Sequence, residues 1–372
     1  MKVGVLGGGQ LGQMLALAGI PLGLRFRFLD PADESPAGQV AERMIGSFED
    51  ADCLDRFADG LDVVTYEFEN VPTASARRLA QRVPVYPPPD ALEVSQDRLA
   101  EKQLFDRLNI PTTQYVAVDT RADLEQAVGR LGYPAVLKTR RFGYDGKGQM
   151  VLRGADDVER AWKQLGGQAL LLEEYIDFEG ELSQLAVRGR DGAVVFYPLV
   201  ENHHKQGILH WSLAPAPATT ADLQRTANDY VLRVLNTLEY VGVLAVEFFQ
   251  RDGRLIANEM APRVHNSGHW TIEGVETSQF ENHLRAVVGW PLGSASTGVY
   301  SAMLNLIGAV PTAESFLAIP DAHVHLYGKA PRPGRKLGHV TLCDADMDQL
   351  LWKFAKARQA AESGQVLSEP EA

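Results

Sequence analysis

The first 95 residues alternate short apolar runs with stretches of helical spacing. Apolar runs at Lys2–Leu6, Arg25–Leu29 and Leu61–Tyr66 predict buried strands. A glycine-rich turn at Gly7–Gly12 follows the first run, and the apolar positions of Gln13–Ala18 have the spacing of a helix. Strands that alternate with helices predict a doubly wound parallel sheet. A group of prolines between positions 84 and 89 puts the end of this domain near residue 95.

The pattern changes after this boundary. Asp97–Leu108 predicts a helix, and Ala135–Lys138 and Gln149–Leu152 predict two strands joined by a glycine-rich loop. From Leu170 onward, apolar runs separated by Gly and Asp turns predict mostly antiparallel strands. Helices are expected at Ala221–Leu238 and, in the tail that starts at Pro291, at Met347–Ala361. The fold class is therefore α/β, with α+β parts.

Composition narrows the possible functions. The 372 residues are 45% apolar and 23% charged, values typical of a globular protein of two or three domains. The net charge of −12 without a basic run argues against nucleic acid or an anionic membrane as partner. Cys53 and Cys343 are too few and too far apart for a disulfide framework or a zinc knuckle. With no signal-peptide pattern and no membrane-spanning run, we expect a cytoplasmic enzyme.

The first turn has the form of a dinucleotide-binding fingerprint. Gly7, Gly9 and Gly12 have the required spacing, and Asp30 follows the next strand, where such proteins bind a ribose hydroxyl. An NAD(P)-dependent oxidoreductase is therefore one hypothesis. The alternative is that any tight strand-to-helix turn in such a sheet needs these glycines.

A second glycine-rich loop, Gly143–Gly148, joins two predicted strands. Its three glycines allow the backbone to close over a ligand and to present N–H groups to phosphates. Lys138, on the preceding strand, could reach the same phosphates as a fixed cation. The alternative is a mobile surface hairpin with a solvated lysine.

Two acidic residues flank a predicted hairpin turn at Asp252-Gly253. With a three-residue turn, Glu247 and Glu259 would lie directly opposite each other, and the repulsion between their carboxylates would destabilise the sheet by roughly 0.2–1 kcal/mol. A divalent cation relieves this repulsion, and oxygen ligands of this kind suit Mg²⁺. A two-residue turn would put the side chains on different faces, as two solvated surface acids. The polar run Asn258–Trp270 directly follows the second strand, where loops commonly carry sites.

Taken together, these segments resemble a known family. Lys138, the loop Gly143–Gln149, Glu173–Ile176, Glu181 and the acid pair are similar to those of ATP-grasp ligases. Within that superfamily, five segments resemble the N5-carboxyaminoimidazole ribonucleotide synthetases: Gly9–Gly12, Tyr66–Asn70, Gly143–Gln149, Ala261–Trp270 and Pro333–His339. The similarity extends to about residue 345.

The resemblance implies an ATP-grasp fold of four parts: residues 1–95, an N-terminal sheet domain; 96–172, a small subdomain with a flap; 173–290, a large subdomain; and 291–372, a C-terminal extension that completes the substrate site. It implies that 5-aminoimidazole ribonucleotide, bicarbonate and ATP give N5-carboxyaminoimidazole ribonucleotide, ADP and phosphate in purine biosynthesis. Mg²⁺ (or Mn²⁺) would be the metal, and the protein a homodimer. The N-terminal sheet would then serve the ribonucleotide. Another ATP-grasp carboxylating or formylating ligase and a non-catalytic relative are the alternatives.

The same resemblance implies roles for individual residues. The nucleotide would be bound by Arg98, Lys138, Gly143, Tyr144, Asp145, Gly146, Lys147, Gly148, Gln149, Glu173, Glu174, Tyr175, Ile176, Glu181, His204, Asn258 and Glu259. The ribonucleotide would be bound by Gln10, Leu11, Glu67, Asn70, Tyr144, Asp145, Arg263, His265, Asn266, Lys329, Arg335 and Lys336. Lys138, Lys147, Arg263, Tyr144 and Asp145 are the expected catalytic residues, and Glu247 and Glu259 the expected metal ligands. Gln13 departs from the family, which often has arginine there.

Overall fold

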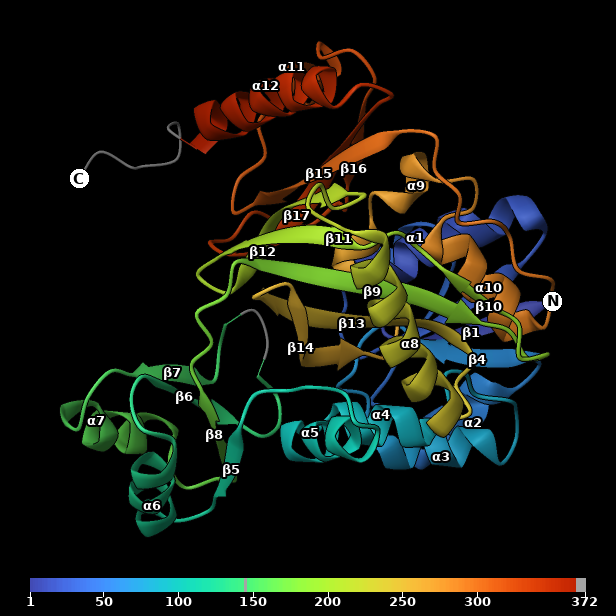
Figure 1. The fold of residues 1–372 in the computed structure, drawn as a ribbon. Helices are drawn as coiled ribbons and strands as arrows, with labels where there is room; N and C mark the ends of the chain where they lie inside the picture. Colours follow the sequence, from blue (N-terminus) through green and yellow to red (C-terminus); the bar gives the residue numbers. More distant parts are fainter. Residues whose placement is uncertain (144–145, 366–372) are drawn as a thin grey trace, which may run out of the picture.

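A computed structural model describes residues 1–143 and 146–365 and contains three β-sheets in that part of the chain (Figure 1). The first sheet is parallel, with strand order β3-β2-β1-β4. Its strands are β1 (Lys2–Leu6), β2 (Arg25–Asp30), β3 (Glu42–Ile45) and β4 (Val63–Tyr66). The helices of this region are α1 (Gln10–Gly19), α2 (Ala51–Ala58), α3 (Thr73–Ala80) and α4 (Pro89–Ser95). The predicted doubly wound domain is therefore present.

Helix α1 begins earlier than the sequence predicts. Gln10, Leu11 and Gly12 are its first residues, not part of the turn. The carboxylate of Glu67, which follows β4, accepts hydrogen bonds from the backbone N–H groups of Gly9 and Gly12. Since the first N–H groups of a helix have no partner within it, a carboxylate at that position stabilises the helix start. The expected start at Gln13 was wrong because the helix start is stabilised by Glu67, which follows β4 and is far from α1 in the sequence.

The second sheet belongs to the small subdomain and is entirely antiparallel, with strand order β5-β8-β6-β7. The elements are α5 (Arg98–Arg107), β5 (Tyr115–Val118), α6 (Arg121–Leu131), β6 (Ala135–Thr139), β7 (Gln149–Leu152), α7 (Asp156–Leu165) and β8 (Leu170–Glu174). Apolar side chains of helices α6 and α7 pack against this sheet and form the core of the small subdomain with it. The expected boundary between residues 172 and 173 falls inside β8, so the strand continues past it.

The third sheet has nine strands and runs through the expected large subdomain and the C-terminal extension. Its main path is β14-β13-β9-β11-β12-β15-β17-β16, and β10 pairs with β9. The strands are β9 (Gly180–Arg188), β10 (Val194–Phe196), β11 (Val200–Lys205), β12 (Ile208–Ala214), β13 (Gly242–Arg251), β14 (Arg254–Ala261), β15 (Tyr300–Ile307), β16 (Ala322–Leu326) and β17 (Lys336–Asp344). The helices are α8 (Ala221–Thr237), α9 (Thr271–Gly274), α10 (Gln279–Val288), α11 (Ala313–Leu317) and α12 (Met347–Gln365). Residues before and after position 290 thus form one sheet.

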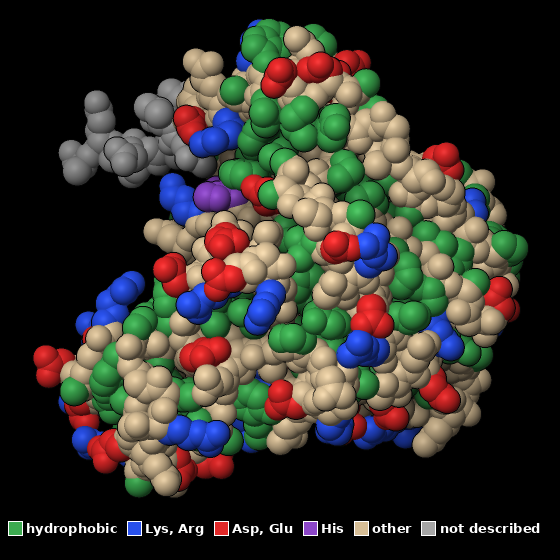
Figure 2. Space-filling view, in the orientation of Figure 1, with side chains coloured by type: hydrophobic (Ala, Val, Ile, Leu, Met, Phe, Trp, Pro, Cys, Tyr) green, Lys and Arg blue, Asp and Glu red, His purple; other side chains and the backbone are tan. Residues whose placement is uncertain are grey.

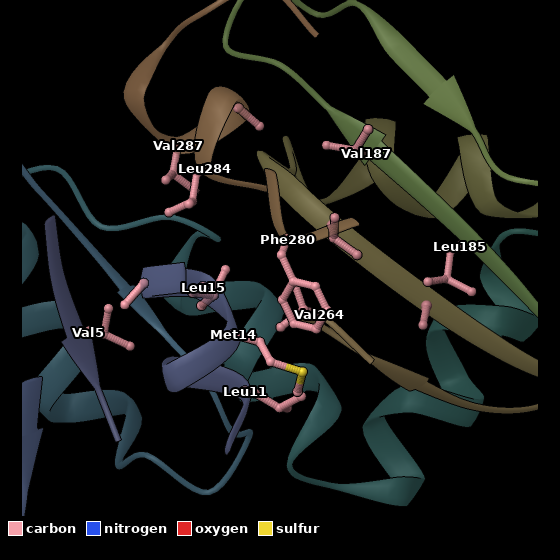
Figure 3. Close-up of a cluster of buried hydrophobic side chains, with 14 of the residues drawn as sticks. Val5, Leu11, Met14, Leu15, Leu185, Val187, Val264, Phe280, Leu284 and Val287 are labelled. Atoms are coloured by element: carbon pink, nitrogen blue, oxygen red, sulfur yellow. The ribbon is translucent and has the colours of Figure 1, made fainter. Parts of the chain in front are cut away.

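The alternation of side chains along the strands explains how this sheet is covered. On β9, Leu182 and Ala186 face α8, whereas Leu185 and Val187 face the opposite side. On that opposite side, α1 of the first domain packs against α10, and their side chains form the shared core drawn in Figure 3. The N-terminal domain is therefore fixed to the large sheet by apolar burial.

Both faces of the large sheet are covered, while the small subdomain stands at one end of the molecule and α12 at the other (Figure 1). The surface in Figure 2 carries acidic and basic side chains interspersed, without one continuous basic area on that face. Within the described ranges, no helix combines the length and apolarity that a membrane crossing requires.

Candidate active site

A cavity of about 790 Å³ opens where the parts of the chain meet. Its wall includes Gln10 and Glu67 from the N-terminal domain, Arg98 from α5, and Glu259 from the large sheet. Lys329 and its neighbours come from the segment between β16 and β17. Ligand sites commonly lie where domains meet.

Many of the residues expected at the site share this wall. They are Gln10, Leu11, Glu67, Asn70, Arg98, Gly143, Lys147, His204, Glu247, Glu259, Arg263, His265, Asn266, Lys329, Arg335 and Lys336. Others do not line it: Lys138, Gly146, Gly148, Gln149, Glu173, Glu174, Tyr175, Ile176, Glu181 and Asn258. Tyr144 and Asp145 lie outside the described residues. The described members of the expected ribonucleotide and metal sets thus share one cavity, whereas much of the expected nucleotide set does not line it.

Glu247 and Glu259 are directly opposite each other on β13 and β14, for a different reason than expected. The turn has two residues, Asp252 and Gly253, both with positive φ, so the assumed three-residue turn was wrong. A β-bulge at Asn258 then shifts the register by one residue, and the two glutamates face each other again. A two-residue turn therefore does not separate the carboxylates here.

The two carboxylates have opposite electrostatic environments. Burial would raise the pKa of Glu259, but the guanidinium of Arg98, 2.8 Å away, lowers it to about 2. Burial and the charge of Glu259 together raise the pKa of Glu247 to about 7. His265 lies 3.6 Å from Glu247, and burial lowers the pKa of that histidine to about 3, so it is neutral at pH 7. The repulsion within this acidic pair would be relieved by a divalent cation with hard oxygen ligands.

Beside the cavity, Glu173 is the buried counter-ion of two lysines. Its carboxylate lies 3.1 Å from the Lys138 ammonium and 3.5 Å from that of Lys102, and it accepts a hydrogen bond from Thr113. Burial would raise the pKa of Glu173, but Lys102 and Lys138 lower it to about 2. The carboxylate of Glu173 thus holds Lys138 in place.

Lys102 is a site residue that the sequence analysis missed. It lies one helical turn after Arg98 on α5, so the two side chains share a helix face. Its ammonium also donates to Thr112 and to the carbonyl of Ala257 on β14. The spacing from Arg98 was a signal in the sequence, but the burial that makes Lys102 part of this cluster depends on the tertiary fold.

Two further pairs fix residues at the edge of the site. The imidazole of His204 lies 2.9 Å from Glu181, which belongs to the neighbouring strand β9. Burial would lower the pKa of His204, but the hydrogen bond to Glu181 and nearby carboxylates raise it. Arg263 forms an ion pair with Glu69, a residue in the Tyr66–Asn70 segment that was not among the expected site residues.

The N-terminus of α1 is already occupied. Glu67 accepts from Gly12 at 2.7 Å and from Gly9, and Asp30 accepts from Gly8 at 2.6 Å. A dinucleotide-binding protein uses N–H groups at this place for the pyrophosphate, and an acid like Asp30 for the ribose. Because the protein's own carboxylates take these groups, the geometry does not favour NAD(P) binding.

Four basic side chains from the segment between β16 and β17 and from the start of β17 also line the cavity. Lys329, Arg332, Arg335 and Lys336 all line it, and the Lys329 ammonium donates to Gln10 at the start of α1. Burial, together with the positive charge of Arg335, lowers the pKa of Lys329 to about 8. The cavity therefore has a carboxylate pair suited to a metal ion and a group of cations suited to a phosphate, and the charge of Lys336 partly opposes the rise in the pKa of Glu247.

Comparison with known proteins decides the family. Family models match the chain as a ribonucleotide synthetase preATP-grasp domain over residues 1–96, an ATP-grasp domain over 103–280, and a phosphoribosylaminoimidazole carboxylase C-terminal domain over 301–353. An N5-carboxyaminoimidazole ribonucleotide synthase from Pseudomonas aeruginosa is 53% identical over 363 residues, which cover 98% of this chain and all of that protein. The chain belongs to the N5-carboxyaminoimidazole ribonucleotide synthase family.

Solved structures of N5-carboxyaminoimidazole ribonucleotide synthases also match the chain over nearly its whole length. The synthetase from Thermus thermophilus superposes with a TM-score of 0.93 at 57% identity, covering 96% of this chain and 98% of that one. The Aspergillus clavatus synthase in complex with ADP and 5-aminoimidazole ribonucleotide gives 0.91 at 34% identity, covering 97% and 98%.

These matches confirm the expected ATP-grasp fold and the expected activity. The chain is an ATP-grasp ligase of purine biosynthesis, of the family that carboxylates 5-aminoimidazole ribonucleotide with ATP. The oxidoreductase hypothesis is set aside by these matches and by the occupied N-terminus of α1. The roles of individual site residues stay predictions.

Glu173→Gln should destabilise this N5-carboxyaminoimidazole ribonucleotide synthase by about 3–5 kcal/mol, because it leaves two buried lysines without their shared counter-ion. The free energy of unfolding, measured by urea denaturation at pH 7, tests this. Since the pKa of Glu173 is lowered in the folded state, its contribution is fully present above the unfolded pKa of 4.5 and is lost as the pH falls toward 2.

The neighbouring Glu174→Gln is the matched control. Glu174 is only partly buried, so this variant should stay within about 0.5 kcal/mol of the wild type. Equal losses in both variants, or a difference between Glu173→Gln and wild type that does not shrink below pH 4.5, would contradict the counter-ion role.

Proposed function

We propose that the chain carboxylates the amino group of 5-aminoimidazole ribonucleotide with bicarbonate, in the cavity between its domains, and releases ADP and phosphate. The charged side chains on the cavity wall are the observation that assigns the reaction to this cavity. The wall carries the partly exposed glutamate pair beside Arg98 together with three cations, Lys329, Arg335 and Lys336. Such a cavity can hold a metal–nucleotide and a sugar phosphate at the same time.

In this proposal the nucleotide phosphates lie between α5, β6 and the flap Gly143–Gln149. Arg98, Lys138 and Lys147 supply cations to the phosphates. Arg98 is held by Glu259, and Lys138 by the buried Glu173. Fixed charges of this kind cost no reorganisation when charge develops in the transition state. Lys147 lies on the cavity wall.

Glu247 and Glu259 would hold Mg²⁺, with Mn²⁺ as a substitute. Their four oxygens and the mutual repulsion that raises the pKa of Glu247 fit a hard divalent cation. Within the described residues, no cluster of three or more acidic, His or Cys side chains forms a complete cation site, so phosphate oxygens would complete the coordination. When bound, the ion would neutralise charge on the transferring phosphoryl group.

The ribonucleotide lies against the basic side chains of the cavity wall in this proposal. Its phosphate meets Lys329, Arg335 and Lys336, with Gln10 and Leu11 from the start of α1. Arg263, held by Glu69, then lies with His265 and Asn266 near the amine that reacts. Tyr144 and Asp145 would join them from the flap, and these two residues lie outside the described part of the chain.

The proposed chemistry has two steps. An oxygen of bicarbonate attacks the γ-phosphorus of ATP, the bond to the β-phosphate oxygen breaks, and ADP and carboxyphosphate form. The substrate amine then attacks the carboxyl carbon, directly or after CO₂ is released, while phosphate leaves and the amine loses a proton. Because carboxyphosphate and CO₂ are lost in water, the site must exclude solvent while both steps occur.

The flap is placed to help exclude water. A Cβ atom on Gly146 would lie 2.9 Å from the carbonyl oxygen of Gln206, so the flap approaches the turn between β11 and β12 closely. Gly143 and Lys147 of the flap also line the cavity. A homodimer in the cytoplasm is part of the proposal too, and it rests on the family resemblance.

The reaction is tested by measuring ADP release from MgATP with and without the other two substrates. Release should require both 5-aminoimidazole ribonucleotide and bicarbonate, and Lys138→Ala should lower kcat at least about a hundredfold, because a fixed cation on the transferring phosphoryl group is lost. Lys163→Ala, on the exposed surface of α7, is the control and should keep full activity. ADP release without the ribonucleotide at the same rate, or full activity of Lys138→Ala, would refute the proposal.

The metal site is tested by binding Mn²⁺ in the presence of ADP, followed by electron paramagnetic resonance. Glu247→Gln should weaken this binding about tenfold or more, since one of two carboxylate ligands becomes an amide. Glu179→Gln, in a nearby exposed segment, should bind as wild type does. Unchanged Mn²⁺ affinity in Glu247→Gln would exclude this residue as a ligand.

The role of Lys329 is tested by the pH dependence of kcat/KM for the ribonucleotide. The pKa of Lys329 is lowered to about 8, so the cation that meets the phosphate is lost as the pH rises past that value. The ratio kcat/KM should therefore fall above pH 8 in the wild type. In Lys329→Arg the fall should move to higher pH, because an arginine stays charged. If both proteins show the same profile, another group is responsible.

A further inference from the structure

A row of polar side chains lies between the C-terminal strands and the loop that follows β14. On the sheet side, Asn305 of β15 pairs with His339 of β17, which pairs with His325 of β16. Facing them are Asn266, His269 and Glu273, whose spacing puts them on one face of the helical segment 266–274. Each has its own partner: Asn266 contacts Asn305, His269 lies against His339 with ring centroids 4.8 Å apart, and Glu273 is 2.7 Å from His325.

Asn305 makes three hydrogen bonds at the end of this row next to the cavity. Its side-chain nitrogen donates to the carbonyl of Leu209 on β12 and to the side-chain oxygen of Asn266, both at 2.8 Å. Its side-chain oxygen accepts from the side-chain nitrogen of Asn266 at 3.1 Å. Because a backbone carbonyl can only accept, Leu209 determines which way the Asn305 amide points.

The orientation of Asn305 in turn determines that of Asn266. The two amides face each other, donor to acceptor, so a flip of Asn266 would place nitrogen against nitrogen and oxygen against oxygen. Each amide group has two donor hydrogens and two acceptor positions. Asn266 therefore keeps one N–H and one lone pair for other partners, in a fixed arrangement, and it lines the cavity.

We propose that Asn305 is a positioning residue: it sets which polar atom of Asn266 meets the ribonucleotide substrate. This inference rests on the proposed function, because Asn266 is placed there at the substrate. Asn305 itself is buried, 4% exposed, and does not line the cavity, so it acts through Asn266. Its link to Leu209 also joins the substrate loop to strand β12, whose preceding turn the flap approaches.

The composition of the row supports a role beyond stability. Both ring nitrogens of His269 and the hydroxyl of Thr341, on the same face of β17 as His339, are buried without a hydrogen-bond partner among the described residues. Unpaired buried polar atoms cost free energy, and an apolar row of similar shape would avoid that cost. Buried polar atoms without partners are expected where side chains serve a binding site and not stability alone.

The test is a double-mutant cycle on binding, measured by titration calorimetry of the full chain with 5-aminoimidazole ribonucleotide and, separately, with MgADP. Asn305→Leu should weaken ribonucleotide binding about tenfold and leave MgADP binding within about twofold, because only the substrate amide loses its orientation. Asn266→Ala should weaken ribonucleotide binding to a similar extent. In the Asn266→Ala background, Asn305→Leu should have no further effect.

Two more variants keep the result interpretable. Asn305→Asp preserves size but cannot donate to Leu209 or Asn266, so it should weaken ribonucleotide binding in the same direction even if Asn305→Leu folds poorly. Thr341→Val, on the strand next to β15, alters the same row without touching Asn266 and should bind both ligands as wild type does.

Equal weakening of both ligands, or the same loss of ribonucleotide affinity from Asn305→Leu in wild-type and Asn266→Ala backgrounds, would overturn the positioning role alone. Wild-type protein that binds MgADP but not the ribonucleotide would overturn the proposed function together with this inference. Thermal unfolding of every variant separates a general loss of stability from the selective loss expected here.

Discussion

The opposition of Glu247 and Glu259 is the constraint on which the site depends. The carboxylates lie on adjacent strands and repel each other. Arg98 lowers the pKa of Glu259, whereas the pKa of Glu247 rises to about 7 although the charges of His204 and Lys336 oppose the rise. The imbalance makes this part of the cavity receptive to an added cation. Arg98 in turn comes from the helix that also carries Lys102, so the electrostatics of the acidic pair and of the lysine cluster are linked through α5.

Much of the fold follows from local patterns in the sequence. The helices expected at Asp97–Leu108 and Ala221–Leu238 are right to within one residue at each end, because caps and apolar spacing are short-range signals. The start of α1 and the register of the β13–β14 hairpin could not be derived in the same way. The first depends on Glu67, which is 55 residues from Gly12, and the second on a bulge at Asn258.

The candidate site was predictable to the extent that its residues form recognisable segments. The glycine loop, the acid pair and the polar run Asn258–Trp270, which begins inside β14, are visible in the sequence, and the family resemblance supplied the rest. Residues that act through others have no such signal. Lys102, Glu69 and Asn305 become noticeable only when the tertiary fold places them beside Glu173, Arg263 and Asn266. A buried partner of this type depends on long-range contact, which spacing along the chain does not encode.

The continuity of the nine-stranded sheet has a mechanical consequence. Strands β12 and β15 are hydrogen-bonded neighbours, so β13 and β14, which carry Glu247 and Glu259, belong to the same sheet as β17, which begins at Lys336. The N-terminal domain packs against the large sheet through the apolar interface between α1 and α10. The antiparallel sheet of the small subdomain shares no strand with the large sheet and has its own apolar core, so a hinge movement of this subdomain would leave the opposition of Glu247 and Glu259 unchanged.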